Sequence, residues 1–194
     1  MMTALTVRVR PTLELNDEQF AQICGQNPDL RFELTAKGEL IVMSPTGSET
    51  GGRNSTLSGQ LWVWNQRSRS GKTFDSSTGF CLPNGAKRSP DASWVRRERW
   101  ESLTPEERRK FAPICPDFVV ELLSPTDELE ITRAKMQEYM ENGALLGWLI
   151  DPNNRRVEIY RCDRDVEIRE NPTTVSGEEV LPGFVLELSD IFTG

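Results

Sequence analysis

Two segments of the chain carry acidic residues where a carboxylate could do chemistry. Residues 89–95, SPDASWV, and residues 115–125, CPDFVVELLSP, each contain a Pro-Asp step that leads into an apolar stretch. Proline favours an extended backbone, so each aspartate should stand at the start of a strand. Glu121 interrupts an otherwise apolar run, and a buried carboxylate is costly unless it is paired, hydrogen-bonded or bound to a metal. Glu121 is therefore either half of a buried ion pair or a metal ligand.

The chain contains no histidine. This composition excludes Ser-His-Asp and Cys-His catalysis, histidine general bases and His-ligated zinc. Four cysteines, Cys24, Cys81, Cys115 and Cys162, form no CxxC pair, and we expect free thiols that are mostly buried. Hydrolytic chemistry would have to come from carboxylates, lysines and a hard metal ion.

Length and charge bound the class of protein. The 194 residues contain no repeat or linker, which predicts one domain over residues 1–194. No apolar run approaches the roughly 20 residues that span a bilayer, and the first residues are not typical of a secretory signal. We therefore expect a cytoplasmic protein without membrane contact. The net charge is −7, yet residues 53–110 carry a net charge of +6; either a basic face for phosphates or a solvated, charge-mixed surface explains this excess.

The N-terminal half predicts two helices and a hairpin. Asn16 and Gln19 have the spacing of a capping box, which favours a helix that ends near Gly25. LRFEL and ELIVM predict a hairpin that turns at Gly38. A long helix is expected over residues 49–67, with an apolar stripe that contains Leu57, Leu61 and Trp64.

The remaining patterns predict a mixed α/β fold. Short strands are expected at KTFDSS, GFCLP and SPDASWV, and a partly helical stretch at 96–111 with Thr104 as a cap. PDFVVELL and LLGWLID are apolar enough to be central strands. A helix over 128–141, capped by SPTD, joins them, so residues 117–150 predict a parallel βαβ crossover. RRVEIYR and GFVLEL predict later strands. The expected fold is a central mixed β-sheet flanked by helices, with an N-terminal hairpin.

Several of these segments together resemble a known family. SPDASWV, PDFVVELLSPTD, RAKMQEYMENGA and LGWLIDP are similar to the Uma family of restriction endonucleases, a bacterial group in the PD-(D/E)xK nuclease superfamily. The resemblance extends to ELIVMSPTG, KTFDSSTGFCLPNG and RRVEIYR, and so covers nearly the whole chain. It implies a restriction-endonuclease-like fold in which carboxylates from neighbouring strands meet at one edge of the sheet. It also implies a Mg²⁺-dependent endonuclease that hydrolyses DNA.

The same resemblance implies roles for particular residues. Asp91 matches the first aspartate of the superfamily motif, and Glu121 matches the second acid. The superfamily pattern has a lysine two residues later, where this chain has Leu123; in the family a lysine on the next helix takes that place, here Lys135. An ordinary exposed helical lysine is the alternative. Glu49 matches a catalytic carboxylate of the first core helix, although a first-turn acid also complements the helix dipole.

Such a set of residues suits hydrolysis of a phosphodiester. Asp91, Glu121 and the backbone carbonyl of Leu122 would hold Mg²⁺, or Mn²⁺, because these ions prefer oxygen ligands. The ion would acidify a water molecule and polarise the phosphate, and Lys135 would orient that water or offset developing charge. DNA is the expected partner, and cleavage of both strands favours a homodimer. The candidates for contacts with the DNA backbone are Arg96, Arg97, Arg99 and Lys110, and a solvated charged helix is the alternative for the same residues.

Other interpretations of the chain stay open at this point. A catalytically silent nucleic-acid-binding or regulatory module would keep the fold without turnover. A metal-free carboxylate-pair enzyme, such as a glycosidase, would need a sugar-stacking platform; three tryptophans fall in predicted core elements instead, namely Trp62, Trp64 and Trp148. Asp117 has either a strand-start or a supporting role, Asp75 is a candidate for the edge of the site, and Gln137 is expected at the surface.

Overall fold

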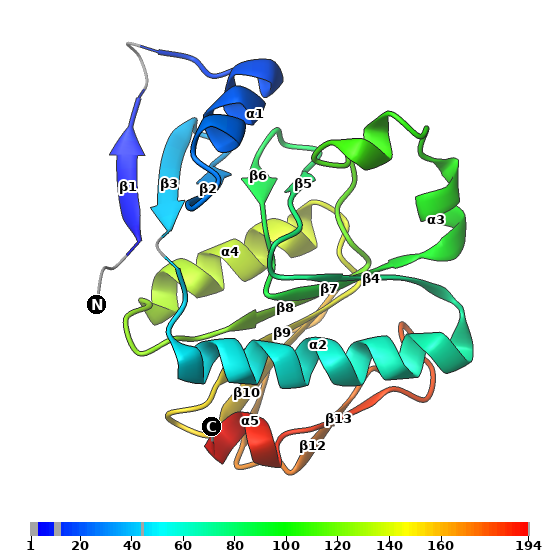
Figure 1. The fold of residues 1–194 in the computed structure, drawn as a ribbon. Coiled ribbons are helices and arrows are strands. Elements are labelled where there is room, and N and C mark those ends of the chain that lie inside the picture. The colour runs from blue at the N-terminus through cyan, green and yellow to red at the C-terminus, as the bar shows by residue number, and fades with distance from the viewer. Residues whose placement is uncertain (1–3, 10–12, 44, 194) are drawn as a thin grey trace.

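The large β-sheet forms the centre of the molecule. The computed structural model describes residues 4–9, 13–43 and 45–193 (Figure 1). Six strands follow the order β11-β10-β9-β8-β7-β4. Their bounds are Glu167–Glu170 for β11, Arg156–Arg161 for β10, Leu146–Asp151 for β9, Phe118–Leu122 for β8, Ala92–Arg96 for β7 and Gly71–Asp75 for β4. Only β8 and β9 pair in parallel, and the other neighbours are antiparallel. The sheet is therefore mixed, as predicted.

A second, smaller sheet lies beside the first and contains the predicted N-terminal hairpin. Its strands follow the order β1-β3-β2-β6-β5. Their bounds are Leu5–Arg8 for β1, Glu39–Met43 for β3, Arg31–Leu34 for β2, Lys87–Arg88 for β6 and Phe80–Cys81 for β5. The turn between β2 and β3 contains Gly38 at a φ of 80°, a conformation that glycine adopts without strain. A two-stranded sheet of β12 (Thr174–Ser176) and β13 (Val185–Glu187) completes the strands of the described residues.

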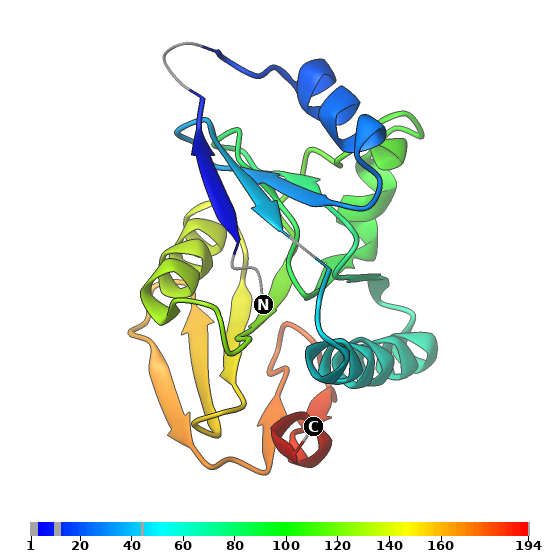
Figure 2. The same ribbon diagram turned by 60° about the vertical axis from the view of Figure 1, so that its left-hand side comes forward.

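Two of the helices cover the two faces of the large sheet. Figure 2 shows its strands between α4 and α2. The described helices are α1 (Asp17–Gln26), α2 (Ser48–Ser68), α3 (Arg97–Ser102), α4 (Leu129–Glu141) and α5 (Ser189–Thr193), with a 3₁₀ turn at Glu107–Arg109. None of them is long and apolar enough to cross a membrane.

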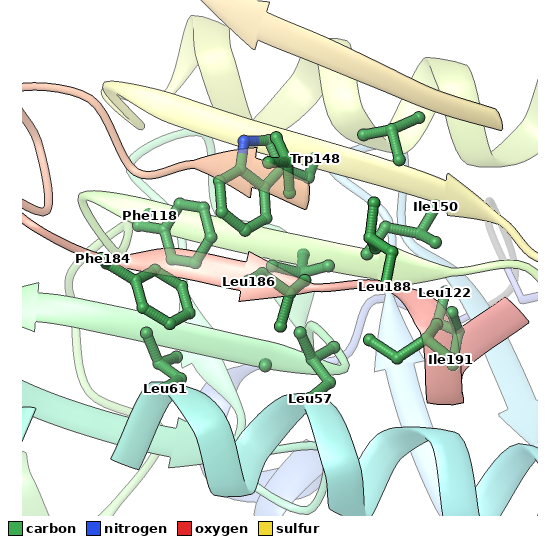
Figure 3. Close-up of a cluster of buried hydrophobic side chains, with 14 of the residues drawn as sticks. Leu57, Leu61, Phe118, Leu122, Trp148, Ile150, Phe184, Leu186, Leu188 and Ile191 are labelled. Atoms are coloured by element: carbon green, nitrogen blue, oxygen red, sulfur yellow. The ribbon is translucent and has the colours of Figure 1, made fainter. Parts of the chain in front are cut away.

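Side chains of β8 alternate between these two faces. Phe118 and Leu122 pack with Leu57 and Leu61 of α2 (Figure 3), whereas Val119 packs in the cluster that α4 covers. Residues two apart on a strand share a face, so Glu121 points towards α4, with Val119. This alternation explains why one carboxylate interrupts an apolar strand that is buried along its whole length.

Several predicted elements are confirmed. The Asn16 side chain accepts from the Gln19 amide at 2.9 Å, and Gln19 Oε1 accepts from the Asn16 amide at 3.0 Å, which is the predicted capping box. The β8–α4–β9 unit is the predicted parallel crossover. Leu57 and Leu61 are fully buried, and Trp64 packs at the margin of the same cluster.

The short strands predicted at KTFDSS and GFCLP are confirmed as β4 and β5, and they belong to different sheets. Asp75 accepts from Ser77 in the turn that follows β4. One predicted helix cap is wrong. SPTD does not cap α4: the N-cap is Glu128 without a side-chain bond, and Asp127 closes a turn with the Ser124 amide. Residues 96–111 are partly helical, as predicted, and Thr104 acts as a cap there, because its Oγ1 accepts from the Glu107 amide at 3.2 Å ahead of a 3₁₀ turn.

Two expectations about burial are also wrong. Trp62 lies on the outer face of α2 and is 54% exposed, so it is not a core residue. Of the four cysteines only Cys115 is buried, and Cys162 is exposed. In both cases the sequence shows that an apolar residue lies in or beside a helix or strand. Its exposure depends on which side of that element it occupies.

Candidate metal and catalytic site

Asp91 and Glu121 meet where β7 begins and β8 ends. The antiparallel register of these strands pairs Ala92 with Val120. One step further along the same register places Asp91 opposite Glu121, and directly opposed residues have Cβ atoms about 5 Å apart. The two acids are thirty positions apart in the sequence, and the pairing of β7 with β8 is what brings them together.

Both oxygens of Asp91 are held in place. Oδ1 accepts from Asn54 Nδ2 at 3.1 Å, and Oδ2 accepts from the Leu122 amide at 2.8 Å. Each carboxylate oxygen has a second lone pair that these bonds leave available. Asn54 Oδ1 is buried and accepts no hydrogen bond within the part of the chain that the structure describes. A buried oxygen without a donor lies beside the aspartate, where a cation or a bound water would satisfy it.

Glu121 contacts two side chains from one face of α4. Its Oε1 accepts from the Tyr139 hydroxyl at 3.0 Å and lies 2.9 Å from Lys135 Nζ. Lys135 and Tyr139 are four positions apart, one helical turn, which places both over the same carboxylate. The Lys135 side chain is 14% exposed, so it is not an ordinary surface lysine. Glu121 Oε2 accepts no hydrogen bond from the described residues.

Burial raises the pKa of both acids. Burial raises the pKa of Glu121 to about 7, and the neighbouring carboxylates of Asp91 and Glu33 add to this while Lys135 opposes it. Burial likewise holds the pKa of Asp91 above its ordinary value, against the Leu122 amide and Lys135. Burial alone would lower the pKa of Lys135, but Glu121 and Glu33 outweigh it and raise that pKa. Repulsion between the two acids is thus the smaller cause, and desolvation is the larger.

The donor set fits a hard divalent ion. The Asp91 and Glu121 carboxylates and the amide oxygen of Asn54 lie where β7 begins and β8 ends. Mg²⁺ commonly binds one or two carboxylates together with water and substrate phosphate. Among the described residues no cluster of three or more acidic or cysteine side chains is arranged to enclose a metal. Two carboxylates and one amide oxygen would leave coordination positions of such an ion for water and a substrate phosphate.

Three residues of this site have no clear signal in the sequence. Glu33 of β2 is 2% exposed and lies 2.8 Å from Lys135 Nζ. In LRFEL it occupies a position that, by alternation, a solvent-facing acid would also occupy. Arg88 lies 3.0 Å from Glu33, and Asn54 reaches Asp91 from α2. These side chains enter the site only because the small sheet and α2 pack against the large sheet.

Other predicted site residues lie outside this group. Glu49 is exposed at the start of α2 and pairs with Arg53 at 2.7 Å; no contact between described residues joins it to Asp91 or Glu121. Asn54, five residues later, is the α2 residue that contacts Asp91. Leu122 offers its amide to Asp91, and its carbonyl as a ligand stays a prediction.

The supporting acids have structural partners. Asp117 accepts from the Arg96 amide at 2.7 Å and pairs with Arg99 at 2.9 Å, at the opposite end of β8 from Glu121. Asp75 is occupied in its turn with Ser77. Gln137 donates to Glu141 on the exposed face of α4, as expected.

The predicted DNA-contacting residues stand away from the acids. β7 has five residues, and at about 3.3 Å per residue its far end places Arg96 and Arg97 about 16 Å or more from Asp91. Both arginines are exposed. Arg99 and Lys110 are engaged in ion pairs with Asp117 and Glu106. Contacts from Arg96 and Arg97 would therefore fall on DNA several nucleotides from a phosphate held at the acids.

Comparisons with known proteins agree with this architecture. A family model named Uma2 and described as "Putative restriction endonuclease" matches residues 17–189. The crystal structure of a protein from Anabaena variabilis ATCC 29413, described as a putative nuclease belonging to DUF820, superposes with a TM-score of 0.74. It is 21% identical, and the match covers 92% of this chain and 98% of that one. No curated protein matches the chain. The structural likeness confirms the predicted restriction-endonuclease-like fold.

Proposed function

The chain belongs to the Uma2 family, whose model is described as "Putative restriction endonuclease", and we propose that it hydrolyses phosphodiester bonds of DNA with the help of a divalent metal ion. The observation that carries this proposal is the convergence of Asp91, Glu121 and Lys135. Glu121 Oε1 lies 2.9 Å from Lys135 Nζ, and Asp91, at the start of β7, accepts from the amide of Leu122, the residue that follows Glu121. Two carboxylates can hold a divalent ion, and a lysine can stabilise charge on the phosphate, so this set can serve phosphodiester hydrolysis without a histidine.

Asp91 and Glu121 would hold the ion, with Asn54 Oδ1 and the Leu122 carbonyl as neutral oxygen donors. Mg²⁺ is the ion that we propose, and Mn²⁺ would replace it because both take oxygen ligands in octahedral sites. When bound, such an ion acidifies a water molecule and neutralises charge on the phosphate. Glu49 is a further candidate for this site, from the exposed first turn of α2.

Lys135 has the position to act on the reacting phosphate. Its ammonium group carries three donors, and the two glutamates that contact it leave one donor for a water molecule or a phosphate oxygen. A fixed positive charge in a partly desolvated site stabilises negative charge that develops in a transition state. The raised pKa of Lys135 keeps it protonated at neutral pH, so we assign it charge stabilisation and orientation of the water rather than proton abstraction.

A plasmid-cleavage assay tests the proposal. Supercoiled DNA is incubated with the protein in Mg²⁺, in Mn²⁺ and in chelator, and nicked or linear products are expected only with metal. Glu121→Gln should remove this cleavage, whereas Glu141→Gln, on the exposed face of α4, should not. DNA binding without cleavage in either metal would favour the catalytically silent module. Sedimentation of the active species would test the homodimer expected from cleavage of both strands.

A further inference from the structure

We propose that Glu33, from the N-terminal hairpin, positions Lys135 and keeps it at the site when Glu121 engages a cation. The inference rests on the proposed function and adds to it a positioning residue in β2. Lys135 Nζ lies 2.8 Å from Glu33 Oε1 and 2.9 Å from Glu121 Oε1. The ammonium group therefore bridges two carboxylates, one from the small sheet and one from the large sheet.

Glu33 is fixed on several sides. Its Oε1 also accepts from the Ser89 amide at 2.9 Å, and its Oε2 lies 3.0 Å from Arg88 Nη1. Arg88 is itself anchored, because its Nε donates to Glu138 Oε2 at 2.6 Å. Glu138 is on α4, three positions after Lys135, so the contacts form a closed loop that runs from α4 through Arg88 and Glu33 back to α4. This loop fixes the Glu33 carboxylate before any cation is bound.

The two partners of Lys135 differ in what else they must do. Glu121 is a proposed ligand of the cation, so its carboxylate would be shared between the cation and Lys135. Glu33 has no contact with Asp91 or Glu121 among the described residues, and its other partners are a backbone amide and Arg88. An ammonium group left without a partner in a buried site is costly. Glu33 therefore supplies the partner that remains, and it keeps the Lys135 charge from competing with the cation for Glu121.

The first test needs neither metal nor activity. In ¹⁵N NMR of the metal-free protein, the Lys135 ammonium signal should be protected from exchange with water in the parent and in Glu121→Gln, and lost in Glu33→Gln. Glutamine is nearly isosteric with glutamate, and its one amide oxygen can still accept from either the Ser89 amide or Arg88, so we expect Glu33→Gln to fold. Loss of the signal in Glu121→Gln with retention in Glu33→Gln would overturn the proposal. This measurement involves no DNA, so its result does not depend on nuclease activity. The proposal for Glu33 and the proposed function can therefore fail independently.

The second test is a double-mutant cycle on Mg²⁺ affinity, measured by calorimetry with Glu33→Gln, Lys135→Met and both together. Removing a partner that orients a site residue typically weakens metal binding by about tenfold to a hundredfold, and we expect this for Glu33→Gln. In the Lys135→Met background the same substitution should have no further effect, because Glu33 acts through Lys135.

A matched control is Glu39→Gln, which removes an acid of the same hairpin that pairs with exposed Arg8. It should leave the Mg²⁺ affinity unchanged. An undiminished affinity in folded Glu33→Gln would make Glu33 a purely structural residue and overturn the proposal. An equal loss with and without Lys135 would also overturn it, since Glu33 would then act on the cation directly.

Discussion

The raised pKa of Glu121 predicts a specific dependence of stability on pH in the metal-free protein. The pKa rises from its ordinary 4.5 to about 7 on folding. A carboxyl group whose pKa is higher in the folded state binds its proton more tightly there. Its contribution to stability is complete below pH 4.5 and is lost as the pH rises to about 7. Each pKa unit corresponds to about 1.4 kcal/mol, so this one group should cost the protein about 3 kcal/mol between those pH values.

Replacing Glu121 with glutamine removes that titration. The difference in unfolding free energy between Glu121→Gln and the parent should therefore change by about 3 kcal/mol from pH 4.5 to pH 7.5, in favour of the variant at the higher pH. For a domain of this size that corresponds to roughly 6–12 °C in Tm. Denaturant titrations of both proteins at several pH values, with chelator present, measure the difference directly.

A second buried glutamate provides the control. Glu158 is 1% exposed on β10 of the large sheet, but the hydrogen bonds from Arg133 and Tyr160 outweigh its burial and lower its pKa. Its contribution is present above pH 4.5 and is lost only at lower pH, so Glu158→Gln should not change the slope between pH 4.5 and 7.5. Parallel stability curves for Glu121→Gln and the parent over that range would refute a raised Glu121 pKa and the desolvated site that causes it.

Three further predictions follow from the site. Lys135→Met should fold, because Glu33 keeps Arg88 as a partner, and its metal-dependent DNA cleavage should fall by at least about tenfold, the loss of one contact worth about 1.4 kcal/mol; full activity would return Lys135 to a structural role. Mg²⁺ should raise the Tm of the parent by mass action, and Asp91→Ala should abolish that increase in a thermal-shift titration. Reversing Arg96 and Arg97 to Glu should weaken DNA binding and flatten its dependence on log salt, while calorimetry finds Mg²⁺ affinity unchanged.

Much of the fold follows from local patterns. The capping box at Asn16, the glycine turn at Gly38 and the apolar strands around α4 depend on interactions between residues a few positions apart. Such interactions can be recognised in the sequence because hydrophobic periodicity and helix capping depend on residues that are close together in the chain. The sheet that each short strand joins is not determined by local interactions. KTFDSS and GFCLP are adjacent in the sequence and yet belong to different sheets. The sheet that a strand joins depends on which sequence-distant strand pairs with its backbone.

The same division applies to the site. The sequence by itself determined that Asp91, Glu121 and Lys135 were the candidates, because a Pro-Asp step, an acid inside an apolar strand and the family resemblance are visible in the residue order. Only the tertiary structure decided that these residues meet, since the β7–β8 register places one acid opposite the other. The tertiary structure also decided which other side chains surround these residues. Glu33 reads as a solvent-facing residue of a hairpin, but packing of the small sheet over α4 buries it against Lys135, and burial turns an ordinary surface charge into a fixed part of the site.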